Sequence, residues 1–177
     1  MELEFKITEQ DFLDYQLFSA SQSARIQKRE RNGHIGLTVG FLLTALYFFF
    51  VSDDLTMAIY FGICGLLNFF FYPKYFKWIY KKYYKKYGRE VYSKRFDKIV
   101  HIDFKDETII SKDFTGEGKY FIKEFENTSE TSQHFFIKHS AGVSLIIPKR
   151  ELKDINEVRS RITALGISIN DYKDWKW

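Results

Sequence analysis

Two long apolar runs dominate the pattern of hydrophobic and polar positions along the chain. Residues 35–51 and 55–72 carry no charged side chain, and only residues 52–54, which include two aspartates, separate them. At about 1.5 Å per residue, each run is near the lower limit for crossing a hydrocarbon core of about 30 Å. Adjacent aspartates are costly inside a bilayer, so they belong in a turn exposed to water. The pattern predicts a transmembrane hairpin over residues 35–72.

Basic residues flank this hairpin on both sides. The bases that precede the first run are Arg25, Lys28, Arg29 and Arg31. Between Lys74 and Arg95, nine bases are accompanied by one acid, Glu90. The mean hydropathy of -0.30 and the net charge of +4 hide this local arrangement. Because positive charge is retained on the cytoplasmic side of membranes, we expect a cell-membrane protein with two spans and both termini in the cytoplasm.

A basic and aromatic segment over residues 73–95 follows the second run. Pro73 can kink or restart a helix at this point. We expect a linker helix lying in the interface, with its aromatic rings at the headgroups and its bases on anionic lipid. The candidate lipid contacts are Lys74, Lys77, Lys81, Lys82, Lys85, Lys86 and Arg89. The alternative is a helix that leaves the bilayer with its aromatic rings packed on a soluble domain.

Residues 1–34 read as an N-terminal strand and helix on the cytoplasmic side. Residues 2–7 alternate between apolar and charged side chains, which is the period of a strand. Thr8 and Asp11 resemble a capping box, so a helix is expected to begin near Glu9 and to run toward Gln27.

Beyond residue 96 the apolar period changes to two, as in short strands. The predicted strands lie at residues 100–104, 108–113, 119–125, 135–138 and 143–147, with a polar loop at residues 127–132. Apolar positions after Pro148 then recur at helical spacing up to Gly166, a suitable C-cap. Hairpin spacing predicts an antiparallel sheet that the N-terminal strand joins. The expected fold is an α+β membrane protein with a two-helix transmembrane hairpin and, at residues 96–177, a small antiparallel β-domain capped by a C-terminal helix.

The layout and one short motif resemble the YcxB-like family, small uncharacterised bacterial membrane proteins. Residues 146–150 read Ile-Ile-Pro-Lys-Arg, similar to the family's signature at the end of its β-domain, and residues 12–17 resemble its aromatic opening. The family often has a tryptophan in the third strand, where this chain has Tyr120 and Phe121. The resemblance implies a β-domain like that of pleckstrin-homology proteins and a place in the bacterial inner membrane. It implies no activity.

The sequence offers no convincing catalytic set. The four histidines lack the spacing of metal ligands, and the single cysteine, Cys64, lies in the apolar block. We therefore expect no catalytic residues, no metal and no cofactor. Lys149 and Arg150 are candidates for contact with an anion or a partner, the alternative being a solvated start of a helix.

The leading functional hypothesis is a non-enzymatic, membrane-anchored interaction module at the cytoplasmic face. Its expected partners are the bilayer and either a protein or anionic headgroups, without nucleic acid, and the oligomeric state stays open. One alternative is an immunity protein that protects against a membrane-targeting toxin, and another is an enzyme acting on lipids.

Asn68, a strongly polar residue within the spans, would bond to the other span, bond to a second protomer, or be solvated by headgroups.

Overall fold

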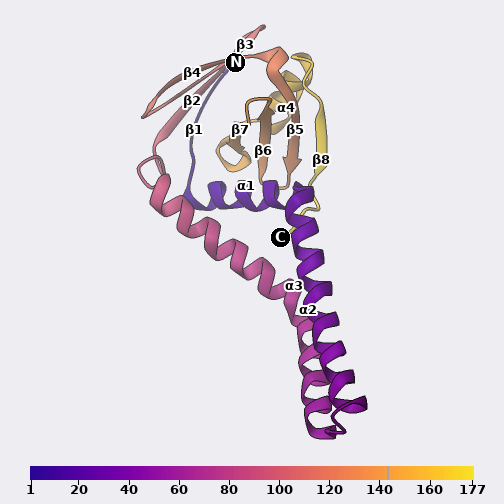
Figure 1. The fold of residues 1–177 in the computed structure, drawn as a ribbon. Coiled ribbons are helices and arrows are strands. Elements are labelled where there is room, and N and C mark those ends of the chain that lie inside the picture. Colours follow the sequence, from indigo (N-terminus) through magenta and orange to yellow (C-terminus); the bar gives the residue numbers. More distant parts are fainter. Residues whose placement is uncertain (143) are drawn as a thin grey trace. The chain divides into compact units, whose positions relative to one another are not determined.

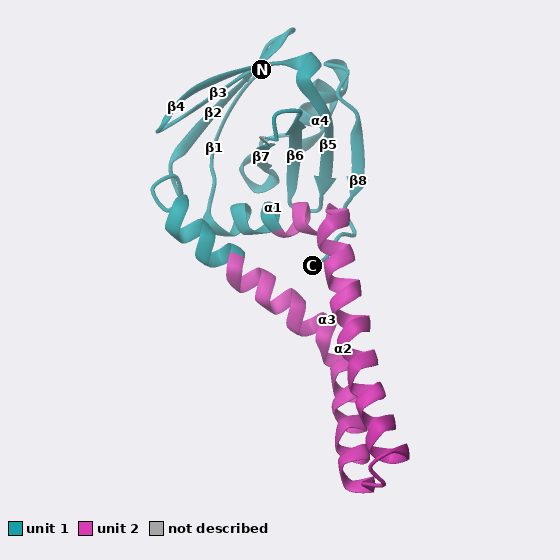
Figure 2. Ribbon diagram, in the orientation of Figure 1, with its two compact units in different colours: residues 1–16, 84–177 teal, residues 17–83 magenta. Residues whose placement is uncertain are grey.

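The computed structural model describes residues 1–142 and 144–177 and divides them into two compact units, residues 17–83 and residues 1–16 with 84–177 (Figure 1, Figure 2). We call them the hairpin unit and the β-domain unit. The described elements are β1 (Glu2–Lys6), α1 (Glu9–Gln22), α2 (Ala24–Phe50), α3 (Leu55–Val91), β2 (Ile99–Phe104), β3 (Thr108–Asp113), β4 (Gly116–Phe121), η1 (Ile122–Glu124), β5 (Phe125–Thr131), β6 (His134–His139), β7 (Ser144–Pro148), η2 (Lys149–Glu151), α4 (Ile155–Ala164) and β8 (Ile169–Tyr172).

The helices α2 and α3 are long and apolar enough to cross a membrane. The most apolar window of each has a mean hydropathy of 1.7. In α2 none of that window is buried within the protein, and in α3 only 11% is buried. A core helix of a soluble protein would be covered by other elements, whereas these side chains have no such cover. The two-helix hairpin predicted from the sequence is confirmed.

Close packing and polar contacts join the two helices of the hairpin. A Cβ at Gly65 would lie 3.3 Å from the Cβ of Phe41, so the glycine allows the backbones to approach closely. Asn68 donates from its Nδ2 to the Oγ1 of Thr38 at 2.9 Å. Of the three alternatives for Asn68, the structure therefore has the bond to the other span.

α3 continues through Pro73 as a single helix of 37 residues. Proline has no N–H, so the carbonyl oxygen of Phe69, four residues earlier, loses its helical donor. His34 on α2 supplies a replacement, because its Nε2 donates to that oxygen at 2.9 Å. The His34 ring also stacks on Tyr72 with centroids 5.4 Å apart. The linker helix expected after residue 73 is thus continuous with the second apolar helix.

Replacing His34 with leucine is expected to lower the free energy of unfolding by about 1–3 kcal/mol, because the Phe69 carbonyl is left without a donor. The check is unfolding of the full-length protein in detergent micelles. In a Pro73→Ala background, the restored N–H at position 73 can bond to Phe69, and the same His34 substitution should have a smaller effect. Equal losses in both backgrounds would contradict this account.

The N-terminal helix is shorter than predicted. α1 ends at Gln22, and Ser23 begins α2 by accepting a hydrogen bond from the backbone N–H of Ile26 with its Oγ. Serine favours N-caps because its hydroxyl satisfies a free backbone donor, and this local bond separates two helices that periodicity alone joins. The capping box at the start of α1 is confirmed, since Thr8 and Asp11 bond reciprocally.

The β-domain unit contains two four-stranded sheets, in the orders β1-β2-β3-β4 and β7-β6-β5-β8. β1 pairs antiparallel with β2, with Phe5 opposite Val100, so the N-terminal strand joins the sheet as predicted. The second sheet is antiparallel except for β8, which pairs parallel with β5. Figure 1 shows the strands of the two sheets. Their core consists of Phe5, Val100, Ile102, Phe104, Ile109, Phe125, Phe135, Ile137, Leu145, Ile147, Val158, Ile162 and Ile167.

The prediction of a polar loop at residues 127–132 is wrong. Most of this segment forms β5, which pairs with β6 on one side and with β8 on the other. Thr128 and Glu130 are fully buried there, at 0% and 2% exposure. A carboxylate such as that of Glu130 enters a sheet interior only when partners compensate for the lost water, and the sequence does not display those partners.

Other borders shift by a few residues. β4 begins at Gly116, three residues before the predicted strand, and the turn η1 follows it. β8 was not predicted. The fifth predicted strand starts at Val143, which lies outside the described residues, and β7 begins at Ser144.

The predicted C-terminal helix is confirmed as α4, which packs Val158 and Ile162 into the core. Asp154 caps its start by accepting from the N–H groups of Asn156 and Glu157. Gly166 follows its end at a φ of +78°, a conformation that favours glycine.

Candidate functional site

The lysine–aromatic segment, residues 74–89, lies entirely within α3. Its seven predicted cationic side chains are all exposed. Tyr75, Trp78 and Tyr83 are each more than half exposed, and Lys82 lies over the Trp78 ring with its Nζ 5.1 Å from the centroid. Spacings of three and four residues place Tyr75, Trp78 and Lys82 on the same side of the helix. An exposed face of α3 therefore combines aromatic rings with ammonium groups.

The opposite side of the segment is more buried. Phe76 is 8% exposed and its ring packs against those of Tyr72 and Tyr80. In the β-domain unit, Tyr87 lies 6.4 Å from the ring of Phe12 on α1. The segment thus has exposed rings in its first part and, near its end, a ring packed against α1 of the β-domain unit.

Ion pairs engage only part of the cationic set. Arg89 donates from Nε to Glu9 at 2.8 Å, and Lys86 lies 3.7 Å from Glu90 one turn away. Within residues 1–142 and 144–177, no carboxylate pairs with the ammonium groups of Lys74, Lys81 or Lys85. These three charges are available to an external anion.

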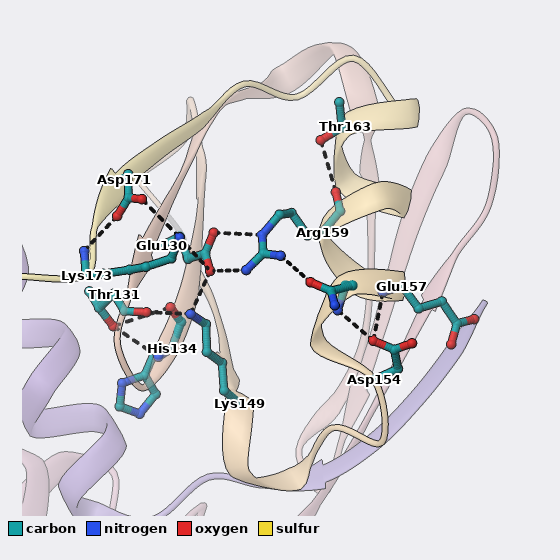
Figure 3. A network of polar contacts seen from close by, with 11 residues as sticks. Glu130, Thr131, His134, Lys149, Asp154, Glu157, Arg159, Thr163, Asp171 and Lys173 are labelled. Atoms are coloured by element: carbon teal, nitrogen blue, oxygen red, sulfur yellow. Dashed lines mark hydrogen bonds and ion pairs between the residues drawn. The ribbon is translucent and has the colours of Figure 1, made fainter.

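The other predicted cations, Lys149 and Arg150, begin the turn η2 directly after β7. Lys149 is buried at 8% exposure. Its Nζ donates to Glu130 at 2.7 Å and to the carbonyl oxygen of Thr131 at 2.6 Å, and it lies 4.8 Å from the centroid of the Phe135 ring. Figure 3 shows the Lys149 side chain directed toward Glu130.

Glu130 on β5 is the buried centre of a cluster of charges. Arg159 on α4 donates to both of its carboxylate oxygens, at 3.1 and 2.6 Å, and Lys173 lies 3.8 Å away (Figure 3). The hydrogen bonds from Arg159 lower the pKa of Glu130, burial opposes them, and Lys149 lowers it further, to about 2. We call Glu130, Lys149, Arg159 and Lys173 the Glu130 cluster. It connects β5, the end of β7 and α4.

Asp11 on α1 is the centre of a second cluster. Arg150 binds it through two hydrogen bonds, of 2.5 and 2.7 Å, and the Nε2 of His134 lies 2.8 Å away. Burial alone would raise the pKa of Asp11, but hydrogen bonds from Arg150, His134 and Thr8 outweigh it and hold that pKa well below its usual value. Since the carboxylate is ionised, Nε2 of His134 is the donor. We call Thr8, Asp11, His134 and Arg150 the Asp11 cluster.

Two consecutive residues of one motif therefore bind two different buried carboxylates. The ion pair of Lys149 connects β7 and the turn η2 to β5, and the ion pair of Arg150 connects the same turn to α1. An external anion at either cation would have to displace an internal carboxylate. The sequence identified the two cations but not their partners. Glu130 lies in a segment that was predicted to be a loop, and Asp11 is 139 residues away from Arg150 in the sequence.

Among the described residues, no three histidine, cysteine, aspartate or glutamate side chains are grouped as metal ligands would be.

Comparison with known families gives a match for part of the β-domain unit. Residues 104–160, from the end of β2 to the middle of α4, match the family model described as YcxB-like protein. This confirms the resemblance drawn from the sequence, over that part of the chain. No curated protein and no solved structure gives a significant match.

Proposed function

We propose that this chain, whose residues 104–160 form a YcxB-like domain, is a non-enzymatic, membrane-anchored interaction module at the cytoplasmic face of the bacterial cell membrane. The hairpin of α2 and α3 anchors it. The lysine–aromatic segment binds anionic headgroups, and the β-domain receives a protein partner. The observation that carries the proposal is that α3 runs without a break from an apolar span into an exposed face of lysines and aromatic rings.

The pairing of β1 with β2 supports two crossings. These strands flank the hairpin in the sequence and yet form one sheet, with Phe5 opposite Val100. A sheet cannot form across a bilayer, so both ends of the hairpin must emerge on one side and the number of crossings must be even. The basic flanks at residues 25–31 and 74–95 favour the cytoplasm as that side.

The chemistry of the segment suits a membrane surface with negative charge. Lysines near such a surface contribute about 1 kcal/mol each, and tryptophan and tyrosine favour the level of the headgroups. Lys74, Lys81 and Lys85 have the free charge for this, and Trp78 and Tyr83 have the exposed rings.

The β-domain has a surface suited to a protein. Phe114 in the β3–β4 turn and Phe121 at the end of β4 are 66% and 51% exposed, and β4 is an edge strand of its sheet. Unpaired strand edges accept further strands, and exposed aromatic side chains are frequent at interfaces. Two sheets with a C-terminal helix, α4, also support the pleckstrin-homology-like character expected of this domain.

Quenching of Trp78 tests the lipid contact. We would replace Trp175 and Trp177 with phenylalanine, so that Trp78 is the one tryptophan left to be excited selectively, and reconstitute the full-length protein in nanodiscs. Brominated phosphatidylglycerol should quench Trp78 more strongly than brominated phosphatidylcholine at equal bromine content, because the lysines gather anionic lipid around it. Replacing Lys74, Lys81 and Lys85 with glutamine should abolish that difference.

The matched control replaces three exposed lysines of the β-domain unit, Lys98, Lys112 and Lys119, with glutamine. It removes the same charge and should keep the preference for the anionic lipid. If neither lipid quenches Trp78, or if both triple variants behave alike, the segment does not bind anionic headgroups.

A further inference from the structure

A cavity of about 530 Å³ lies inside the β-domain unit. Its walls come from both sheets, with Ile102 of β2 on one side and Leu145 of β7 on the other. The start of α1 and residues 92–96, which follow α3, complete it. The volume lies within the range of about 300–1,000 Å³ that is usual for small-molecule sites. None of the lining residues belongs to the lysine–aromatic segment.

Aromatic rings from separate elements line this cavity. Phe12 of α1 lies 4.6 Å from Tyr92 and 5.9 Å from Phe96, measured between ring centroids. Tyr120 of β4 and Tyr15 of α1 also face it, and the hydroxyl of Tyr15 donates to Ser144 at 2.8 Å. Flat apolar ligands pack well among such rings, through offset and edge contacts.

A single cation, Arg95, accompanies these rings in the lining. Its guanidinium carbon lies 5.7 Å from the centroid of the Tyr92 ring. Asp113 is the one acid among the described lining residues, and its carboxylate accepts hydrogen bonds from Thr115 and Gly116 in the β3–β4 turn. Against the opposing effect of burial, these hydrogen bonds and the charge of Arg95 lower the pKa of Asp113, but Arg95 and Asp113 form no direct ion pair. Across the described parts of the chain, no carboxylate forms an ion pair with Arg95. Its planar set of N–H donors matches a carboxylate.

We infer that this cavity binds a small aromatic carboxylate, with the flat body among Phe12, Tyr92, Phe96 and Tyr120 and the carboxylate on Arg95. The rings account for a flat apolar body. The guanidinium of Arg95, which no described carboxylate contacts at ion-pair distance, accounts for the negative end. The site goes beyond the proposed function, since it requires neither anionic lipid nor a protein partner.

The test uses the full-length protein in nanodiscs and fluorine NMR of 6-fluoro-2-naphthoate. Empty nanodiscs give the background from the lipid. The wild type should broaden the fluorine signal in a saturable way, and the neutral amide of the same ring system should bind at least about tenfold more weakly, since it lacks the charge that Arg95 binds. Arg95→Gln should weaken naphthoate by a similar factor.

Three further variants separate the site from general effects. Arg95→Lys should recover part of the binding, because it keeps the charge and loses the two-pronged geometry. Ser111→Phe, which fills the cavity, should remove binding of both the acid and the amide. Lys98→Gln removes an exposed cation outside the lining and should bind naphthoate like the wild type.

The inference is overturned if the wild type does not bind naphthoate above empty nanodiscs, or if acid and amide bind equally. It is also overturned if Arg95→Gln binds as well as the wild type. Thermal melting of each variant verifies that it is folded, and Arg95 is exposed, so its substitution provides a test that does not depend on filling the core.

Discussion

Glu130→Gln is expected to lower the free energy of unfolding of the β-domain by about 3–5 kcal/mol, because it leaves the buried ammonium group of Lys149 without its counter-charge. Arg159 loses its ionic partner at the same time, which loosens α4 from β5. Urea unfolding of the full-length protein in mild detergent, followed by circular dichroism, measures the loss.

Glu126→Gln is the matched control. Glu126 lies on the same strand as Glu130, but its pair with Lys138 is exposed, so we expect a loss below about 1 kcal/mol. Adding Lys149→Met to Glu130→Gln removes the stranded charge and should recover part of the stability. If the two glutamine variants lose the same amount, burial of the Glu130 cluster does not determine its strength.

Asp11→Asn is expected to lower the free energy of unfolding at neutral pH by about 3 kcal/mol. It should also make the free energy of unfolding depend less strongly on pH in the acid range. The pKa of Asp11 is held below its usual value of 3.8, so the ionised carboxylate contributes stability that is fully present above that value. As the pH falls below about 4, the unfolded chain takes up the proton more readily, and this contribution declines. The wild type should therefore lose stability in acid more steeply than Asp11→Asn.

The measurement is a series of urea titrations between pH 7 and pH 2.5. Glu130 also has a lowered pKa, so some acid sensitivity should persist in the variant. Asp106→Asn is the control, since Asp106 is 92% exposed and its pair with Arg161 should contribute less than about 1 kcal/mol. Parallel acid profiles for wild type and Asp11→Asn would contradict a stabilising role of the ionised carboxylate.

The fold was predictable wherever local patterns decide it. Uncharged runs indicated the two long helices, and alternation indicated β1, β3 and β6, whose observed bounds agree within one or two residues. The failure at residues 127–132 has a physical cause. A strand that buries Glu130 depends on partners from α4 and η2. Hydropathy along the sequence cannot represent a charge that is stabilised by a distant guanidinium.

The candidate site divides in the same way. The lysines of α3 were found because they cluster within one short segment of a single helix, so that local composition reveals them. The roles of Lys149 and Arg150 were not predictable, because their carboxylates come from elements 19 and 139 residues away. The cavity gives no periodic signal at all, since its rings come from α1, β4 and the segment after α3.

The pairing of β1 with β2 also has a consequence for the order of events during biosynthesis. β1 leaves the ribosome before either apolar helix, and its partner follows only after both. Under the proposed membrane anchoring, the strand therefore has no partner while the hairpin enters the bilayer. During this time the unpaired backbone N–H and C=O groups of β1 can pair with strands of other chains. Charged Glu2, Glu4 and Lys6 alternate along β1, and such charges discourage association between strands. Insertion would then be a prerequisite for closure of the first sheet, and a stalled second helix would leave β1 without its partner.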